Sequence, residues 1–116
     1  MDIKIITDKV TQSELLQMAK DGFGDMVKAV VDVEKKIIAV GGELHADAEA
    51  ILLENGSKQE NLWGINIYPE KAATERIEFT SLINIRPSVG NRSMDIQDEN
   101  VRQIIKQTAK DLGIID

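Results

Sequence analysis

Apolar residues recur at every second position in several segments of the chain, a spacing typical of β-strands with one buried face. This alternation predicts strands at residues 27–33 and 36–40. The two residues between these segments are too few for any connection but a hairpin turn, so we expect the strands to be antiparallel neighbours. A short apolar run at residues 3–6 predicts an opening strand.

A second hairpin is predicted in the latter half of the chain. Residues 62–68 alternate until Pro69 stops the strand, and residues 76–86 carry the longest alternation in the sequence. One face of the first of these strands is expected to join the core through Trp63, Ile65 and Ile67. If the hairpin is in register, the reverse face displays four polar side chains, Asn66, Tyr68, Asn84 and Arg86.

Helical periodicity predicts a first helix at residues 12–21. Thr11 and Glu14 have the spacing of a capping box at its start. Gly22 suits the left-handed residue that closes the last turn of a helix.

Two further helices are predicted. The second lies within residues 44–57, where Asn55 and Gly56 suit its C-terminus. Its start is open, because either Gly42 caps it or the preceding strand continues and the helix begins at His45. The third follows Asp98, a good N-cap, and ends at Gly113.

The order strand, helix, hairpin, helix, hairpin, helix predicts an α+β fold. We expect a mainly antiparallel sheet of two hairpins, with four to five strands and three helices on one face. The length of 116 residues predicts one domain over residues 1–116. A further apolar stripe on the second helix, formed by Ala46, Ala50 and Leu53, indicates self-association, for example as a homodimer.

Composition narrows the classes of function. The formal net charge of −6 disfavours nucleic-acid binding, because neutralising phosphates needs a basic face. No apolar run approaches the roughly 20 residues of a membrane span, and the N-terminus lacks a signal-peptide pattern, so we expect a cytoplasmic protein. The absence of cysteine excludes disulfides, thiolate nucleophiles and Cys-ligated metals.

The only histidine, His45, lies in the acidic segment GGELHADAE. In a helix His45 and Glu49 would be i, i+4 neighbours and could hold one side of a divalent metal. In an extended segment Glu43, His45 and Asp47 would instead form a chelating row. A structural interpretation competes with both, since acids in the first turn stabilise a helix N-terminus. We therefore assign no metal ligand and expect no cofactor.

A second candidate site follows the last predicted strand, in the stretch RPSVGNRS. Arg86, Asn91, Arg92 and Ser93 would together form a clamp for a carboxylate or phosphate. The alternative is that these arginines pair with acids of the second helix, such as Glu43 or Asp47.

Three stretches, VGGELHADAE, ENGSKQENLWGINIYPE and INIRPSVGNRSMDI, carry a resemblance over about residues 26–113. Together they resemble a small uncharacterised family of bacterial and archaeal proteins, a domain of unknown function. The resemblance implies a single-domain cytosolic protein and transfers no catalytic residue.

The function expected from the sequence is that of a small binding or interaction module for a small anionic ligand or a partner. Its ligand-binding residues would be His45, Asn66, Tyr68, Asn84, Arg86, Asn91, Arg92 and Ser93. The alternative is a small metal- or anion-dependent, hydrolase-like enzyme, in which His45 and nearby carboxylates activate water.

Overall fold

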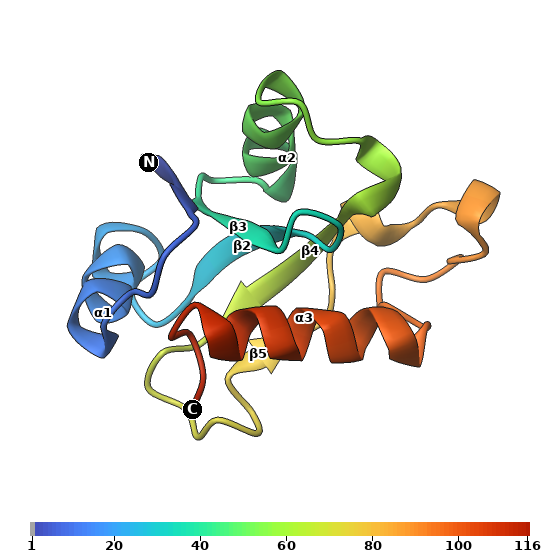
Figure 1. Ribbon diagram of the computed structural model, residues 1–116. Helices are drawn as coiled ribbons and strands as arrows, with labels where there is room; N and C mark the ends of the chain where they lie inside the picture. The colour runs from blue at the N-terminus through green and yellow to red at the C-terminus, as the bar shows by residue number, and fades with distance from the viewer. Residues whose placement is uncertain (1) are drawn as a thin grey trace.

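A computed structural model describes residues 2–116, which form a five-stranded antiparallel sheet and three α-helices (Figure 1). The elements are β1 (Ile3–Ile6), α1 (Gln12–Asp21), β2 (Val27–Asp32), β3 (Ile37–Gly41), α2 (His45–Glu54), β4 (Leu62–Ile67), β5 (Ile77–Glu78) and α3 (Glu99–Asp111). The strand order in the sheet is β1-β3-β2-β4-β5, with antiparallel pairing throughout. The predicted α+β class and antiparallel sheet are confirmed. Within residues 2–116 every helix is too short or too polar to cross a membrane.

The capping box predicted for α1 is present. The Glu14 backbone N–H donates to Thr11 Oγ1 at 3.1 Å, and the Thr11 N–H donates to Glu14 Oε1 at 3.2 Å. The prediction for the other end of this helix is wrong, because Gly22 has a φ of −103°. The left-handed conformation falls instead on Gly24, whose φ is +100° and whose N–H donates to Ala19 O at 2.7 Å.

Helix α2 begins at His45, as in the second predicted start, although strand β3 ends at Gly41 and does not continue to Leu44. Leu44 is the N-cap in extended conformation, and its backbone N–H donates to Asp47 Oδ2 at 3.1 Å. Asp47 therefore stabilises the helix start, as acids in a first turn do. At the other end the predicted Asn55 and Gly56 close the helix, with Gly56 at a φ of +94°.

The turn between β2 and β3 is organised by Asp32, which is buried. Its Oδ1 accepts from the backbone N–H groups of Glu34 and Lys35, both at 2.9 Å, and its Oδ2 accepts from Ser57 Oγ at 2.7 Å. A carboxylate that bonds the backbone two and three residues ahead stabilises a tight turn. Lys36 completes the turn with a φ of +58°.

Helices cover both faces of the sheet, so the expectation that all three lie on one face is wrong. Leu15 of α1 and Ile105 and Ala109 of α3 pack in the larger core cluster. Ala48 and Leu52 of α2 pack on the reverse face in a second cluster. Figure 1 shows α2 above the sheet and α3 below it. The reason is that the reverse face is apolar too, through Val30, Ala39 and Leu62.

The second predicted hairpin is only partly formed. Strand β5 pairs with β4 as expected, but it contains only two residues, Ile77–Glu78. The chain then leaves the sheet for 3-10 turns at Leu82–Asn84 and Pro87–Val89. A serine starts the first of these turns, because Ser81 Oγ accepts from the Ile83 N–H at 3.2 Å.

Asn84 replaces a regular strand partner beside β4. Its Oδ1 accepts from the Gly64 N–H at 2.8 Å, and its Nδ2 donates to Gly64 O at 3.0 Å. The close approach requires a glycine in β4, since a Cβ on Gly64 would lie 2.5 Å from Ser81 Cβ. The predicted outward position of Asn84 is therefore wrong, because the side chain is fully buried.

Candidate functional site

A groove of about 340 Å³ lies at the N-terminal end of α2, on the α2 face of the sheet. Its apolar lining comes from the residue before β2, the start of α2 and the irregular segment after β5. These residues are Met26, Leu44, Ala46, Leu82, Ile83 and Met94. Its polar lining consists of Lys28, His45, Asn66, Thr80 and Ser81. Four of the apolar side chains, Leu44, Ala46, Leu82 and Met94, are exposed at the surface.

The groove exists because α2 covers only part of its face of the sheet. Lys28 of β2 and Asn66 of β4 are cross-strand partners on that face. The helix packs over Val30, two residues along from Lys28. The uncovered end of the sheet face is bordered instead by the turn at Leu82–Asn84, which crosses beside β4.

His45 lies in the wall of this groove and is 8% exposed. Its Nε2 lies 2.8 Å from Ile65 O. Because a carbonyl oxygen only accepts, Nε2 must carry the proton, and in the neutral ring Nδ1 is left as an acceptor. Burial lowers the pKa of His45 below its ordinary value, and the positive charge of Lys28 lowers it further. His45 is therefore neutral at physiological pH.

Asn66 forms the floor of the groove and is 7% exposed. Its Nδ2 donates to Glu78 Oε1 at 2.7 Å and more weakly to Thr80 O at 3.4 Å. Its Oδ1 is buried and has no hydrogen-bond partner among the described residues. A buried carbonyl oxygen without a donor is uncommon in folded proteins and is destabilising, so it marks a place where a ligand group or water could bind.

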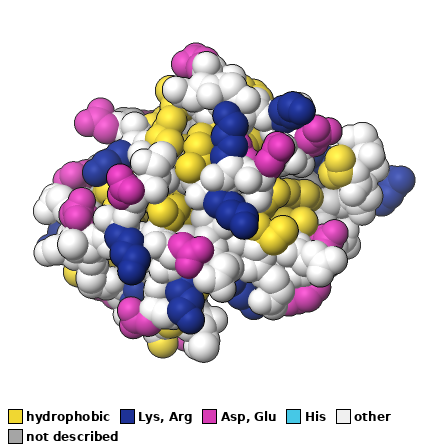
Figure 2. All heavy atoms as spheres, viewed as in Figure 1, with side chains coloured by type: hydrophobic (Ala, Val, Ile, Leu, Met, Phe, Trp, Pro, Cys, Tyr) yellow, Lys and Arg dark blue, Asp and Glu magenta, His cyan; other side chains and the backbone are white. Residues whose placement is uncertain are grey.

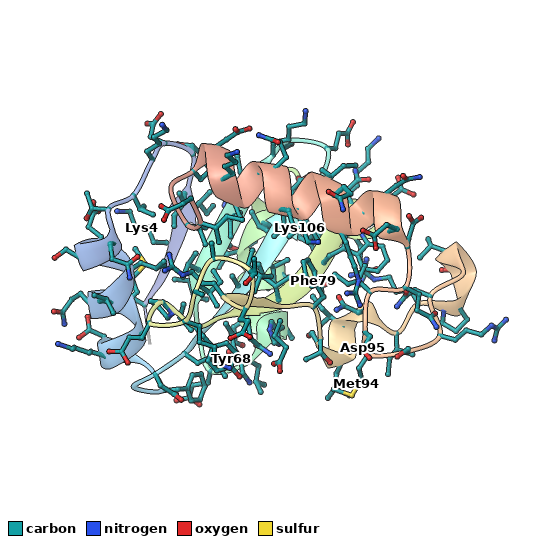
Figure 3. All side chains as sticks on the ribbon, turned by 90° about the horizontal axis from the view of Figure 1, so that it is seen from below. Lys4, Tyr68, Phe79, Met94, Asp95 and Lys106 are labelled. Carbon is teal, nitrogen blue, oxygen red and sulfur yellow. The ribbon has the colours of Figure 1, made fainter. Side chains whose placement is uncertain are left out.

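Tyr68 lies beyond the groove, next to the β4 terminus. Burial and the neighbouring carboxylates of Glu78 and Asp25 raise the pKa of its hydroxyl. Lys71 Nζ lies 4.3 Å from the centre of the Tyr68 ring. In Figure 3 Tyr68 is separated along the molecule from Met94, which does line the groove. Glu78 bonds to Asn66 and influences the pKa of Tyr68, but of these predicted neighbours Asn66 alone lines the groove.

Arg86 is paired with an acid of α2, as the structural alternative foresaw, but the acid is Glu49. Arg86 Nη2 lies 3.3 Å from Glu49 Oε2, and the two side chains are 11% and 13% exposed. The guanidinium carbon lies 5.2 Å from the centre of the Trp63 ring. Burial lowers the pKa of Arg86, while Glu49 opposes this shift. Arg86 Nη1 is buried and has no hydrogen-bond partner within residues 2–116, but Arg86 does not line the groove.

Asn91 organises the loop after β5. Its Nδ2 donates to the carbonyls of Asn84, Ser93 and Asp95 at 2.8 to 3.0 Å. Its Oδ1 accepts from the Gln97 N–H at 2.9 Å. Both polar atoms of the side chain are therefore used within the fold, as are those of Asn84.

The remaining two residues of the predicted clamp also lie outside the groove. Arg92 is exposed and its backbone N–H donates to Gln97 Oε1 at 3.1 Å. Ser93 Oγ accepts from the Asp95 N–H at 3.0 Å. Of the predicted ligand-binding residues, only His45 and Asn66 line the groove, whereas Asn91 bonds to Asn84 and Ser93 in the loop after β5.

The two arrangements that would make His45 a metal ligand are not formed. The segment from His45 onward is helical, so Glu43, His45 and Asp47 do not form an extended row. Glu49, the helical neighbour of His45, is paired with Arg86. Among residues 2–116 there is no group of three histidine or acidic side chains suited to a metal ion.

Sequence reasoning missed several residues of the groove, including Lys28, Leu82 and Met94. Lys28 had a usable signal, since strand alternation places it on the face opposite Val27 and Ala29. Leu82 and Met94 had none, because they reach the groove through an irregular segment whose path follows from side-chain hydrogen bonds.

A family model described as "Protein of unknown function (DUF5674)" matches residues 4–112. Neither a curated protein nor a solved structure matches the chain.

Proposed function

Since the chain belongs to this family of unknown function, we propose its function from the groove itself: a small non-enzymatic binding domain that holds a ligand between α2, β4 and the turn at Leu82–Asn84. The ligand is a small molecule with an apolar body and a polar head.

One observation carries this proposal, the unpartnered Oδ1 of Asn66 in the floor of the groove. A carbonyl oxygen excluded from water costs about 1–3 kcal/mol when no donor reaches it. A donor that reaches this oxygen would recover that free energy, which supports a ligand with a donor group.

The apolar lining supports the second part of the proposal. Leu82 is 71% exposed, and Leu44 and Met94 are also exposed at the mouth of the groove. Small-molecule sites are mostly apolar, with a few polar groups that fix the orientation of the ligand. The groove has this composition, with His45 and Asn66 among its polar lining residues.

The anionic ligand expected from the sequence has less support than the binding function itself. Its proposed clamp relied on Arg86, Arg92 and Asn91, which lie elsewhere or are used within the fold. Lys28 is the one basic side chain of the groove lining. The enzyme alternative has less support, because His45 donates to Ile65 O and its helical neighbour Glu49 is paired with Arg86.

The proposal is tested by titrating the ¹⁵N-labelled protein with a library of small apolar fragments and following backbone amide shifts. We expect ligands to shift His45, Ala46, Asn66 and Ile83 together. The variant Asn66→Leu keeps the size of the side chain but removes the acceptor, and should weaken binding. Asn100→Ala, at an exposed position of α3, is the matched control. Shifts that centre on another surface would contradict the proposal.

A further inference from the structure

The orientation of the Asn66 amide is fixed by its neighbour Glu78. Only the amide nitrogen can donate to a carboxylate, and the Nδ2 to Oε1 distance is 2.7 Å. Rotating the amide by half a turn would set two acceptor oxygens against each other. The oxygen of Asn66 therefore remains the atom that is buried without a partner.

The second polar group of the groove is also an acceptor. His45 donates from Nε2 to Ile65 O, so the neutral ring keeps a lone pair on Nδ1. His45 and Asn66 both line the groove, and the Asn66 side chain is among the groups that influence the pKa of His45. Two neighbouring acceptors in a largely apolar groove call for a ligand that brings hydrogen-bond donors.

The charges around the groove disfavour a charged head. A carboxylate has no donor to offer, so its lone pairs would face those of Asn66 Oδ1. An ammonium has donors but would lose its hydration in a largely apolar lining and would meet the positive charge of Lys28. An uncharged head with N–H or O–H donors avoids both penalties.

Resting on the binding function proposed above, we propose that the groove selects an uncharged donor head, namely a primary carboxamide or an alcohol, on a short branched apolar tail. The N–H or O–H of the head donates to Asn66 Oδ1. The carbonyl of a carboxamide can also accept from Lys28 or from the first turn of α2, whose leading N–H groups have no intrahelical acceptor. The tail lies against Leu82, Ile83 and Met94.

The test uses three probes of similar shape: isovaleramide is neutral, isovalerate is an anion and isoamylamine is a cation. Each is titrated into the ¹⁵N-labelled protein at neutral pH, and Kd is taken from the shifts of groove amides. We expect the amide to bind at least five-fold more tightly than either charged probe. In Asn66→Leu this preference should disappear, with the amide falling to the level of the carboxylate. A dispersed amide spectrum verifies that the variant is folded.

Three results would overturn the inference, and they differ in whether the proposed binding function survives. Tightest binding by isovalerate, lost in Lys28→Met, would make the groove an anion site and leave the binding function intact. Failure of all three probes to shift groove amides, in a protein that binds fragments elsewhere, would remove the binding function together with the selectivity. Equal binding of the three probes would refute the selectivity alone.

Discussion

Single asparagine side chains substitute for regular secondary structure in the segment between β5 and α3. The Asn84 side chain bonds to both the backbone N–H and the backbone carbonyl of Gly64. Its Nδ2 also donates to Met94 O at 3.1 Å. Because the side chain is fully buried, its removal leaves the backbone N–H and the carbonyl of Gly64 without their partner, while Met94 O keeps its bond from the Ser81 N–H.

We therefore expect Asn84→Ala to lower the free energy of unfolding by about 3 kcal/mol, since each unsatisfied buried group costs roughly 1–3 kcal/mol. Urea denaturation followed by tryptophan fluorescence measures the change. Asn100→Ala, which removes an exposed amide, should change stability by less than about 0.5 kcal/mol. Equal effects of the two substitutions would show that the Asn84 contacts contribute little.

His45 makes stability depend on pH. Its pKa is lowered in the folded protein by burial, so the unfolded chain, at its ordinary value of 6.5, binds a proton more readily. The free energy of unfolding therefore falls as the pH drops below about 6.5, with a slope of at most about 1.4 kcal/mol per pH unit. Above that pH the contribution of the neutral ring is fully present.

The measurement compares wild type with His45→Gln by urea denaturation between about pH 7.5 and pH 5.5, a range in which ordinary carboxylates stay ionised. The loss of stability on acidification should be smaller in the variant. Parallel pH profiles for the two proteins would mean that His45 does not titrate differently in the folded and unfolded states.

At the level of elements, the β2–β3 turn combines a stabilising side chain with an unfavourable backbone conformation. Asp32 bonds two backbone N–H groups of the turn, while Lys36 adopts a φ of +58°. The left-handed region costs an ordinary residue about 1–2 kcal/mol, whereas glycine adopts it freely.

Lys36→Gly is accordingly expected to raise the free energy of unfolding by about 0.5 kcal/mol, after the extra entropy of glycine in the unfolded chain is subtracted. Lys35→Gly changes the adjacent residue, which does not have a positive φ, and should be destabilising by a similar amount. Thermal unfolding of both variants gives the comparison. Destabilisation by both glycines would show that the backbone at Lys36 is not strained.

The elements that the sequence predicted well are those with local signals. Helices α1 and α3 have polar caps at Thr11 and Asp98, and the β2–β3 hairpin has an apolar alternation that continues on either side of a short turn. The strand predicted over residues 76–86 failed because its last part is directed by long-range contacts. Asn84 meets Gly64 from twenty residues away, and no periodicity encodes such a bond.

The same distinction applies to the candidate site. His45 and Asn66 stood out as polar residues at the start of a helix and on a strand, and both line the groove. Asn91 also stood out, yet it serves the loop, because an asparagine that binds a ligand and one that binds its own backbone look alike in sequence. The two roles of asparagine can be distinguished only once the course of the backbone in the folded protein is known.

On the scale of the whole molecule, two apolar clusters sandwich the sheet, and the outer side of α2 remains uncovered. Ala46, Ala50 and Leu53 are exposed along that side. Figure 2 shows acidic and basic side chains interspersed on the face in view, with hydrophobic side chains between them. Small residues let two helices approach closely, and an antiparallel pair would set Leu53 of one copy over Ala46 of the other.

We expect this face to support a homodimer that light scattering coupled to size exclusion detects at high micromolar concentration. Ala50→Glu places a charge in the middle of the contact and should yield a monomer with unchanged circular dichroism. Ala72→Glu, at an exposed position outside α2, is the control and should remain dimeric. A monomeric wild type at that concentration would remove the expectation.

The pairing of Asn84 with Gly64 has a further consequence for how the protein behaves in a crowded solution. Strand β5 protects β4 only near Asn66 and Ile67, so the peptide of Gly64 would otherwise be a free docking point for a foreign strand. The Asn84 side chain bonds to the N–H and carbonyl of Gly64, so no further strand can pair with β4 at this residue. A variant without this side chain would leave the N–H and carbonyl of Gly64 unpaired at the edge of the sheet, where another strand can pair with them.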